Sequence, residues 1–240
     1  MITKLENGRI YDPINKINGK IKDLFIKNGK IIDRPKRNEK ISKIINFKKK
    51  IIMAGGIDIH SHIAGGKVNL ARLLLPEEHR KYLHSSSNIL RSGSGLGTCS
   101  SFHIGYKYAK LGYTAVFEPA VLPSNSRSAI IEMSDIPLID KGTYTVLGND
   151  DFLLKLIQKK SNQKKINDYV AWIIQSTKSL GIKIVNPGGI NAFKFNQREL
   201  DLDEKNKKYN ITPRSILKVL TKSLIDLKAP HPIHVHGCNL

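Results

Sequence analysis

From residue 51 onward, short apolar segments rich in β-branched residues alternate with longer segments whose apolar residues recur at helical spacing. This alternation is typical of βαβ units, which build a parallel sheet covered by helices. The first expected strand ends at His62, and the others cover residues 113–118, 143–147, 182–185 and 233–236. The expected helices cover about residues 101–110, 127–133 and 167–180, and one more begins at Thr212-Pro213. The sequence therefore predicts an α/β fold in which the ends of parallel strands meet on one face.

The predicted element boundaries carry signals of their own. Gly112 and Gly181 each follow an expected helix, where a C′ glycine ends helices. Pro119 follows the second expected strand, and we expect it to end that strand. The segment after His62 is polar and rich in glycine and serine up to about residue 97, so we expect a functional loop there.

Residues 1–52 have a different pattern, in which short apolar runs are separated by turn signals. Asn-Gly pairs at 7–8, 18–19 and 28–29 predict tight turns between strands, because these residues tolerate positive φ. A β layer of about 50 residues buries too little surface to be stable alone. We therefore expect two parts, a small N-terminal β-sandwich layer over residues 1–52 and the strand–helix part over residues 53–240.

The net charge of the 240-residue chain is +20, which raises the question of a nucleic-acid partner. The lysines are scattered, with short runs at 48–50, 159–160, 164–165 and 205–208, and no aromatic residues are interleaved among them. We interpret them as solvated surface residues and expect no nucleic-acid partner.

Cysteine content and hydropathy bear on the compartment. Cys99 and Cys238 are too few for a disulfide framework, which favours a reducing environment. The N-terminus has no apolar signal-peptide segment, and no apolar run approaches the ~20 residues of a membrane span. We expect a cytoplasmic chain that makes no contact with a membrane.

Two histidines, His60 and His62, end the first expected strand. Residues two apart on a strand share one face about 6.5–7 Å apart, which suits two imidazoles that bind one metal ion. A bare His-x-His is also compatible with two polar residues at a strand end. Its place at the end of an apolar strand favours a metal site, because α/β barrels carry their chemistry there.

Lys183 is a charged residue inside an apolar strand, between Ile182 and Ile184. Alone it is compatible with a lysine that reaches the surface or forms an ion pair. In a barrel, however, it would lie near His60, His62 and the His234-Val-His236 run. A buried neutral lysine can react with CO₂ to give a carbamate, which can bridge two metal ions about 3.5–4 Å apart.

Several segments resemble the metal-dependent amidohydrolase superfamily and, within it, the A subunits of formylmethanofuran dehydrogenases, archaeal enzymes of methanogenesis. The general resemblance lies in the Asn-Gly turns of the N-terminal strands and in residues 55–62. The more specific segments are 60–69, 105–115, 182–189 and 231–236 with Asn239. The resemblance extends over essentially the whole chain.

The resemblance assigns roles to individual residues. His60, His62 and His236 match metal ligands, and Lys183 matches the catalytic lysine that bridges two Zn²⁺ ions as a carbamate. His234 lies on the same face as His236 and is the second choice for that ligand. No metal role can be assigned to the remaining histidines considered: His79, His84, His103 and His231.

The resemblance also implies a fold, an activity and partners. The fold is an incomplete (β/α)₈ TIM-type barrel, with about five of eight strands, after the N-terminal layer. The activity is formation or hydrolysis of the formamide C–N bond of formylmethanofuran, with methanofuran and formate as substrates and other dehydrogenase subunits as partners.

The chain also departs from this family. A histidine after strand six and an aspartate after strand eight complete the family's site, and the sequence ends after the fifth expected strand. We therefore expect a truncated chain without the C-terminal catalytic part, whose open sheet edges favour aggregation. Two alternatives stay open: an inactive relic with a structural role only, and another amidohydrolase of the dihydroorotase or hydantoinase kind.

Overall fold

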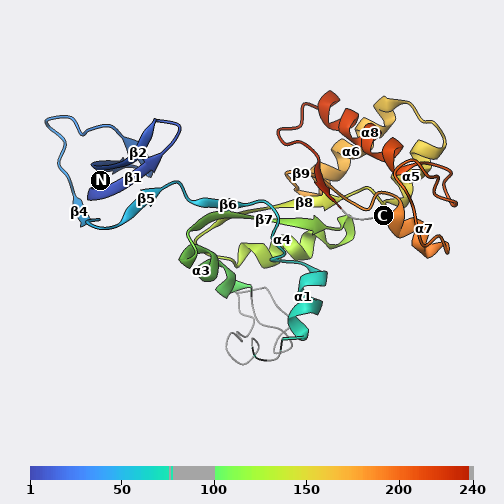
Figure 1. Cartoon of the computed structure of the whole chain (residues 1–240), viewed down its shortest axis with the longest axis horizontal. Helices are drawn as coiled ribbons and strands as arrows, with labels where there is room; N and C mark the ends of the chain where they lie inside the picture. Colours follow the sequence, from blue (N-terminus) through green and yellow to red (C-terminus); the bar gives the residue numbers. More distant parts are fainter. Residues whose placement is uncertain (76, 78–100, 238–240) are drawn as a thin grey trace. The chain divides into compact units, whose positions relative to one another are not determined.

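The computed structural model describes residues 1–75, 77 and 101–237, and these form two compact units, Met1–Gly55 and Gly56–Leu240 (Figure 1). Most of the segment expected as a functional loop lies outside the described residues, as do Cys99, Cys238, His79, His84 and Asn239. Within the described ranges, no helix combines the length and the apolarity needed to cross a membrane.

The N-terminal unit is a five-stranded mixed sheet. Its strands are β1 (Ile2–Asp12), β2 (Ile17–Lys27), β3 (Lys30–Ile32), β4 (Lys43–Asn46) and β5 (Ile51–Met53). Antiparallel pairs join β1 to β2 and β2 to β3, whereas β4 and β5 both pair with β1 in parallel. Ile2, Ile10 and Phe25 are its buried apolar residues. The predicted N-terminal β layer is therefore present.

Only one of the three Asn-Gly pairs forms the expected hairpin turn. Asn28-Gly29 joins β2 to β3 with φ of 51° and 73°. Asn7-Gly8 lies inside β1, where the register shifts, so the positive φ of Asn7 forms a bulge and not a turn. A Cβ on Gly8 would lie 2.3 Å from Ile52 Cδ1, so a larger residue there would require the Ile52 side chain to move. Asn18-Gly19 likewise lies inside β2, so both turn predictions were wrong.

The first expected strand is divided in the structure. Residues Ile51–Met53 form β5, which belongs to the N-terminal sheet, and the parallel sheet begins with β6 (Gly56–Asp58). His60 lies in a bend after β6 and His62 in the irregular segment that follows, so neither is on a strand and the alternation argument for their common face was wrong. The strand ends at Asp58, whose side chain accepts a hydrogen bond from the His60 backbone N–H (3.0 Å).

The second unit contains a five-stranded sheet whose strands are all parallel, in the order β10-β9-β8-β7-β6. The remaining strands are β7 (Tyr113–Val121), β8 (Asp140–Val146), β9 (Gly181–Val185) and β10 (His234–His236). Neighbouring strands in the sheet are consecutive in the chain, as in a barrel wall. The predicted α/β class with an incomplete barrel is confirmed.

Helices connect these strands (Figure 1). They are α1 (Gly66–Leu73), α3 (Phe102–Lys110), the 3₁₀ turn η1 (Pro123–Asn125), α4 (Ser126–Ser134), α5 (Asp151–Gln158), α6 (Gln163–Thr177), α7 (Gly189–Lys194) and α8 (Pro213–Asp226). Helix α8 begins as expected, with Thr212 accepting from Ser215 N in a capping box. Helices α1, α5 and α7 were not expected.

Two boundaries differ from expectation for identifiable reasons. Strand β7 continues through Pro119 to Val121, because a register shift against β8 between Glu118 and Val121 accommodates the proline. Helix α6 ends at Thr177, with Lys178 in the left-handed conformation (φ 55°), and Gly181 begins β9.

Apolar side chains of the second unit form two buried clusters. One lies among β9, α5, α6 and α8, and includes Ile182, Ile184 and Leu220. The other contains Val116 of β7, Ile104 of α3 and Ala129 of α4. Because Ile182 and Ile184 face the helices, Lys183 between them faces the opposite side of the sheet.

Candidate metal centre

Lys183 is completely buried in the middle of β9. Its Nζ lies 3.2 Å from His60 Nδ1. Residue His234 of the edge strand β10 is its register partner in the neighbouring strand. Strand pairing therefore brings together a lysine and histidines from three separate parts of the chain.

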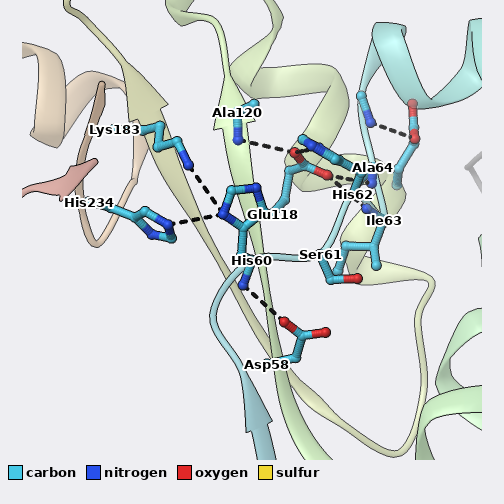
Figure 2. Close-up of polar contacts among 12 residues, drawn as sticks. Asp58, His60, Ser61, His62, Ile63, Ala64, Glu118, Ala120, Lys183 and His234 are labelled. Atoms are coloured by element: carbon cyan, nitrogen blue, oxygen red, sulfur yellow. Dashed lines mark hydrogen bonds and ion pairs between the residues drawn. The ribbon is translucent and has the colours of Figure 1, made fainter. Parts of the chain in front are cut away.

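His60 is at the centre of the histidine group (Figure 2). Its Nδ1 lies 3.1 Å from His234 Nε2. The His60 ring centroid is 5.7 Å from that of His62 and 5.3 Å from that of His236. The structure thus brings together the three histidines singled out as ligands, the second choice His234, and Lys183.

The environment disfavours positive charge on this group. Burial lowers the pKa of Lys183, an effect that the nearby Glu118 carboxylate partly opposes. Burial, followed by the positive charges of Lys183 and the neighbouring histidines, lowers the pKa of His60. The same causes lower the pKa of His234 to about 4. Neutral imidazoles and a lysine that loses its proton more easily are the forms that bind metal or react with CO₂.

The donor set fits zinc, for which imidazole nitrogens and carboxylate-type oxygens are ordinary ligands. In the described part of the chain, Lys183 forms no ion pair despite its complete burial. The rings pack edge to face instead of converging on one point. Among the described residues, no three His, Cys, Asp or Glu side chains are arranged so that they could hold a metal ion.

A buried carboxylate that sequence reasoning missed adjoins the group. Glu118 of β7 accepts a hydrogen bond from His62 Nδ1 (2.9 Å) and others from the backbone N–H groups of Ile63 (2.7 Å) and Ala64 (3.3 Å) (Figure 2). The only feature of Glu118 in the sequence is its position at the end of an expected apolar strand. An acidic residue at such a position is usually exposed to solvent. Glu118 and the His62 segment are more than fifty residues apart in the chain.

The other described histidines lie outside this group. His231 is exposed, and His103 lies on α3. A cavity of about 490 Å³ opens beside His62 and Glu118, and His103 contributes to its wall. Most of its wall comes from residues 63–68 and from α3 and α4, including Ile104, Tyr108 and Ala129. Its volume lies in the range of small-molecule sites, about 300–1,000 Å³.

Comparison with known proteins identifies the family. A family model described as "Amidohydrolase family" matches residues 43–203, a range that includes His60, His62 and Lys183. The chain belongs to the amidohydrolase family. The buried lysine and the histidines at the strand ends are therefore part of an amidohydrolase fold.

Two curated relatives match nearly the whole chain. The protein FwdA of Methanocaldococcus jannaschii is 38% identical over 236 residues, which cover 98% of this chain and 41% of FwdA. The A subunit of the formyltransferase/hydrolase complex Fhc of Methylorubrum extorquens is 35% identical over 240 residues, or 100% of this chain and 42% of that protein. The predicted resemblance to this group of proteins is confirmed. The chain spans less than half the length of either relative.

Solved structures agree with this assignment. The crystal structure of the formyltransferase/hydrolase complex FhcABCD from Methylorubrum extorquens, in complex with methylofuran, contains a chain similar to this one. The TM-score is 0.87 at 36% identity, over 100% of this chain and 43% of that chain. Phenylurea hydrolase B shares the fold alone, with a TM-score of 0.56 at 10% identity.

Proposed function

We propose that this chain provides the first part of a dinuclear zinc centre that forms or hydrolyses the formamide C–N bond of formylmethanofuran. The observation that carries this proposal is the burial of Lys183 without an ion pair among the described residues, 3.2 Å from His60 Nδ1. A buried lysine in a purely structural role would have a carboxylate partner or would be replaced by an apolar residue.

In this proposal His60, His62 and His236 bind metal through ring nitrogens. The neutral amine of Lys183 attacks the carbon of CO₂, a C–N bond forms, and the nitrogen loses one proton to solvent. The resulting carbamate supplies two oxygens, which suits a bridge between two ions. Zinc, when bound, supplies Lewis acidity toward a carbonyl oxygen and lowers the pKa of water.

The nature of the substrate is inferred from the relatives. The long matches to FwdA and to the Fhc protein support a formamide on a furan-type carrier, because the Fhc complex was crystallised with methylofuran. They also support other subunits as partners, because the Fhc relative is a subunit of the complex FhcABCD. A role in methanogenic CO₂ reduction is part of this proposal. A dihydroorotase from Elusimicrobium minutum is 40% identical over only 60 residues, so the dihydroorotase-type alternative has weaker support.

We propose that the substrate binds in the cavity beside His62. Its wall is mainly apolar but carries several charged or polar side chains, among them Lys67, Arg72 and Asn125, and His62 of the proposed metal centre lines it. An apolar wall excludes water from a reacting carbonyl and so strengthens the electrostatic interactions made there.

A deformylation assay tests the proposal. The chain is mixed with zinc, bicarbonate and a second polypeptide that covers the remainder of FwdA, and release of formate from formylmethanofuran is measured. We expect formate release from the mixture and none after Lys183→Ala, with the exposed Lys165→Ala as control. Formate release that survives Lys183→Ala would contradict the proposed centre. A chain that takes up no zinc under the same conditions would contradict the proposed centre as well.

A further inference from the structure

Glu118 is a carboxylate with only 1% of its surface exposed, in a chain region rich in apolar side chains. Its Oε1 accepts from His62 Nδ1 (2.9 Å) and from Ala120 N (3.1 Å). Its Oε2 accepts from Ile63 N (2.7 Å) and Ala64 N (3.3 Å). We propose that Glu118 is a positioning residue that fixes the orientation and the tautomer of His62 for zinc, an inference that rests on the proposed metal centre.

The hydrogen-bond pattern around Glu118 determines what His62 can do. The backbone N–H groups of Ala120, Ile63 and Ala64 donate to the two oxygens of Glu118, and an ionised carboxylate can only accept hydrogen bonds from its neighbours, His62 included. The Nδ1 of His62 must therefore carry a hydrogen. This leaves the lone pair of a neutral His62 on Nε2, the atom free to bind a metal ion.

His62 needs such a partner because its side chain is 55% exposed. An exposed imidazole samples several rotamers and both tautomers, and only some of these present a lone pair to the centre. Glu118 also holds the two buried residues that follow, Ile63 and Ala64. One carboxylate from β7 thus fixes both the ring and the backbone beside it.

A second buried carboxylate provides a matched control. Glu132 of α4 accepts from Gly65 N (3.0 Å) and from Asn69 Nδ2 (2.6 Å), so it holds the same segment of chain. Glu132 also forms an ion pair with Arg72, at 3.7 Å. None of these three contacts of Glu132 involves a histidine. If Glu118 merely anchored this segment, neutralising either carboxylate would affect zinc binding to the same extent.

The first test measures the affinity of the full chain for zinc, with bicarbonate present, by competition with a chromophoric chelator. We expect Glu118→Gln to weaken zinc binding by about 10–100-fold and Glu132→Gln to change it by less than about threefold. Equal losses in the two variants, or no loss in Glu118→Gln, would overturn the role of Glu118. A wild-type chain that binds no zinc would overturn the metal centre itself, so the two failures are distinguishable.

The second test needs no variant at Glu118, so it stands even if Glu118→Gln does not fold. Long-range ¹⁵N–¹H spectra of the metal-free wild-type chain report which ring nitrogen of His62 carries hydrogen, with His62→Asn used for assignment. We expect the Nδ1–H tautomer to predominate. A predominant Nε2–H tautomer would overturn the proposal.

Discussion

At the scale of single residues, the burial of Lys183 opposes stability, whereas the proposed metal centre requires it. A buried amine costs free energy that an apolar residue of similar length would not cost. Its position was predictable, because a charge between Ile182 and Ile184 in an apolar strand is conspicuous in the sequence. Glu118 was not predictable, because its hydrogen-bond partners lie far away in the chain and only the pairing of β6 with β7 brings them close.

Replacing Lys183 by methionine should stabilise the metal-free chain. Lys183→Met keeps the length of the side chain and removes the amine that burial disfavours. We expect the free energy of unfolding at neutral pH to rise by about 0.5–2 kcal/mol, measured by urea denaturation. As control, the exposed Lys165→Met on α6 should change it by less than about 0.5 kcal/mol. A Lys183→Met chain less stable than wild type would mean that the lysine stabilises the fold.

At the scale of elements, the pairing of β9 with β10 places His234 and His236 differently in the proposed metal centre. His234 is opposite Lys183, its Nε2 lies 3.1 Å from His60 Nδ1, and its ring packs against Tyr144 with centroids 5.1 Å apart. His236 is exposed and lies at the end of the strand, with its ring centroid 5.3 Å from that of His60. We therefore propose His236 as the ligand, because its ring is exposed, and assign His234 a role in orienting its neighbours.

Alanine substitution separates these two roles. His236→Ala should weaken zinc binding by more than about tenfold, or about 1.4 kcal/mol, and His234→Ala should weaken it less. Calorimetric titration of both variants and of the exposed His231→Ala checks this order. The opposite order, with the larger loss in His234→Ala, would assign the ligand to His234.

A second element-scale prediction concerns the segment between α7 and α8. The hydroxyl of the buried Tyr209 donates to Asp151 Oδ1 (2.7 Å) in the first turn of α5. Burial, and then this hydrogen bond, raises the pKa of Tyr209 to about 12. Because folding raises the pKa of Tyr209, this side chain stabilises the folded chain at pH values below its pKa in the unfolded chain, about 10. The stabilisation is lost as the pH rises through the folded-state pKa.

Tyr209→Phe should therefore be less stable than wild type at pH 7, by about 1 kcal/mol for the lost hydrogen bond. The difference should shrink as the pH rises from about 10 to about 12, where wild type alone loses the contribution of Tyr209. Urea denaturation at several pH values measures this difference. A difference that stays constant up to pH of about 12 would contradict the assigned hydrogen bond.

The elements that sequence reasoning missed have physical explanations. Helix α5 has an identifiable signal, because Asp150 caps it by accepting from Leu153 N, and its apolar residues have helical spacing. Helix α7 spans only six residues and follows Gly188 in the left-handed conformation, so local propensity does not indicate it. The division between β5 and β6 depends on which sheet each three-residue strand joins, and such short segments carry no period that decides this.

At the scale of the whole molecule, the number of ligands limits the number of ions. The four proposed ligands His60, His62, Lys183 and His236 would have to serve two zinc ions, which usually need three or four ligands each, some of them shared. The chain covers 41–42% of the length of its curated relatives. We therefore expect these 240 residues alone to retain fewer than two zinc ions per chain, and weakly.

Elemental analysis of the purified chain after gel filtration measures this ratio. Addition of the second polypeptide from FwdA should raise the ratio toward two if it contributes further ligands. Two tightly held zinc ions per chain without that addition would contradict the proposed ligand count.

The proposed centre depends above all on Lys183, which is to bind zinc as a carbamate beside His60 and His62. The most direct measurement is the zinc affinity of wild type and Lys183→Ala, each with and without bicarbonate. We predict that bicarbonate strengthens zinc binding by wild type by more than about tenfold and has no effect on Lys183→Ala. A zinc affinity of wild type that does not change with bicarbonate would contradict the carbamate-bridged centre. So would a zinc affinity of Lys183→Ala that still increases with bicarbonate.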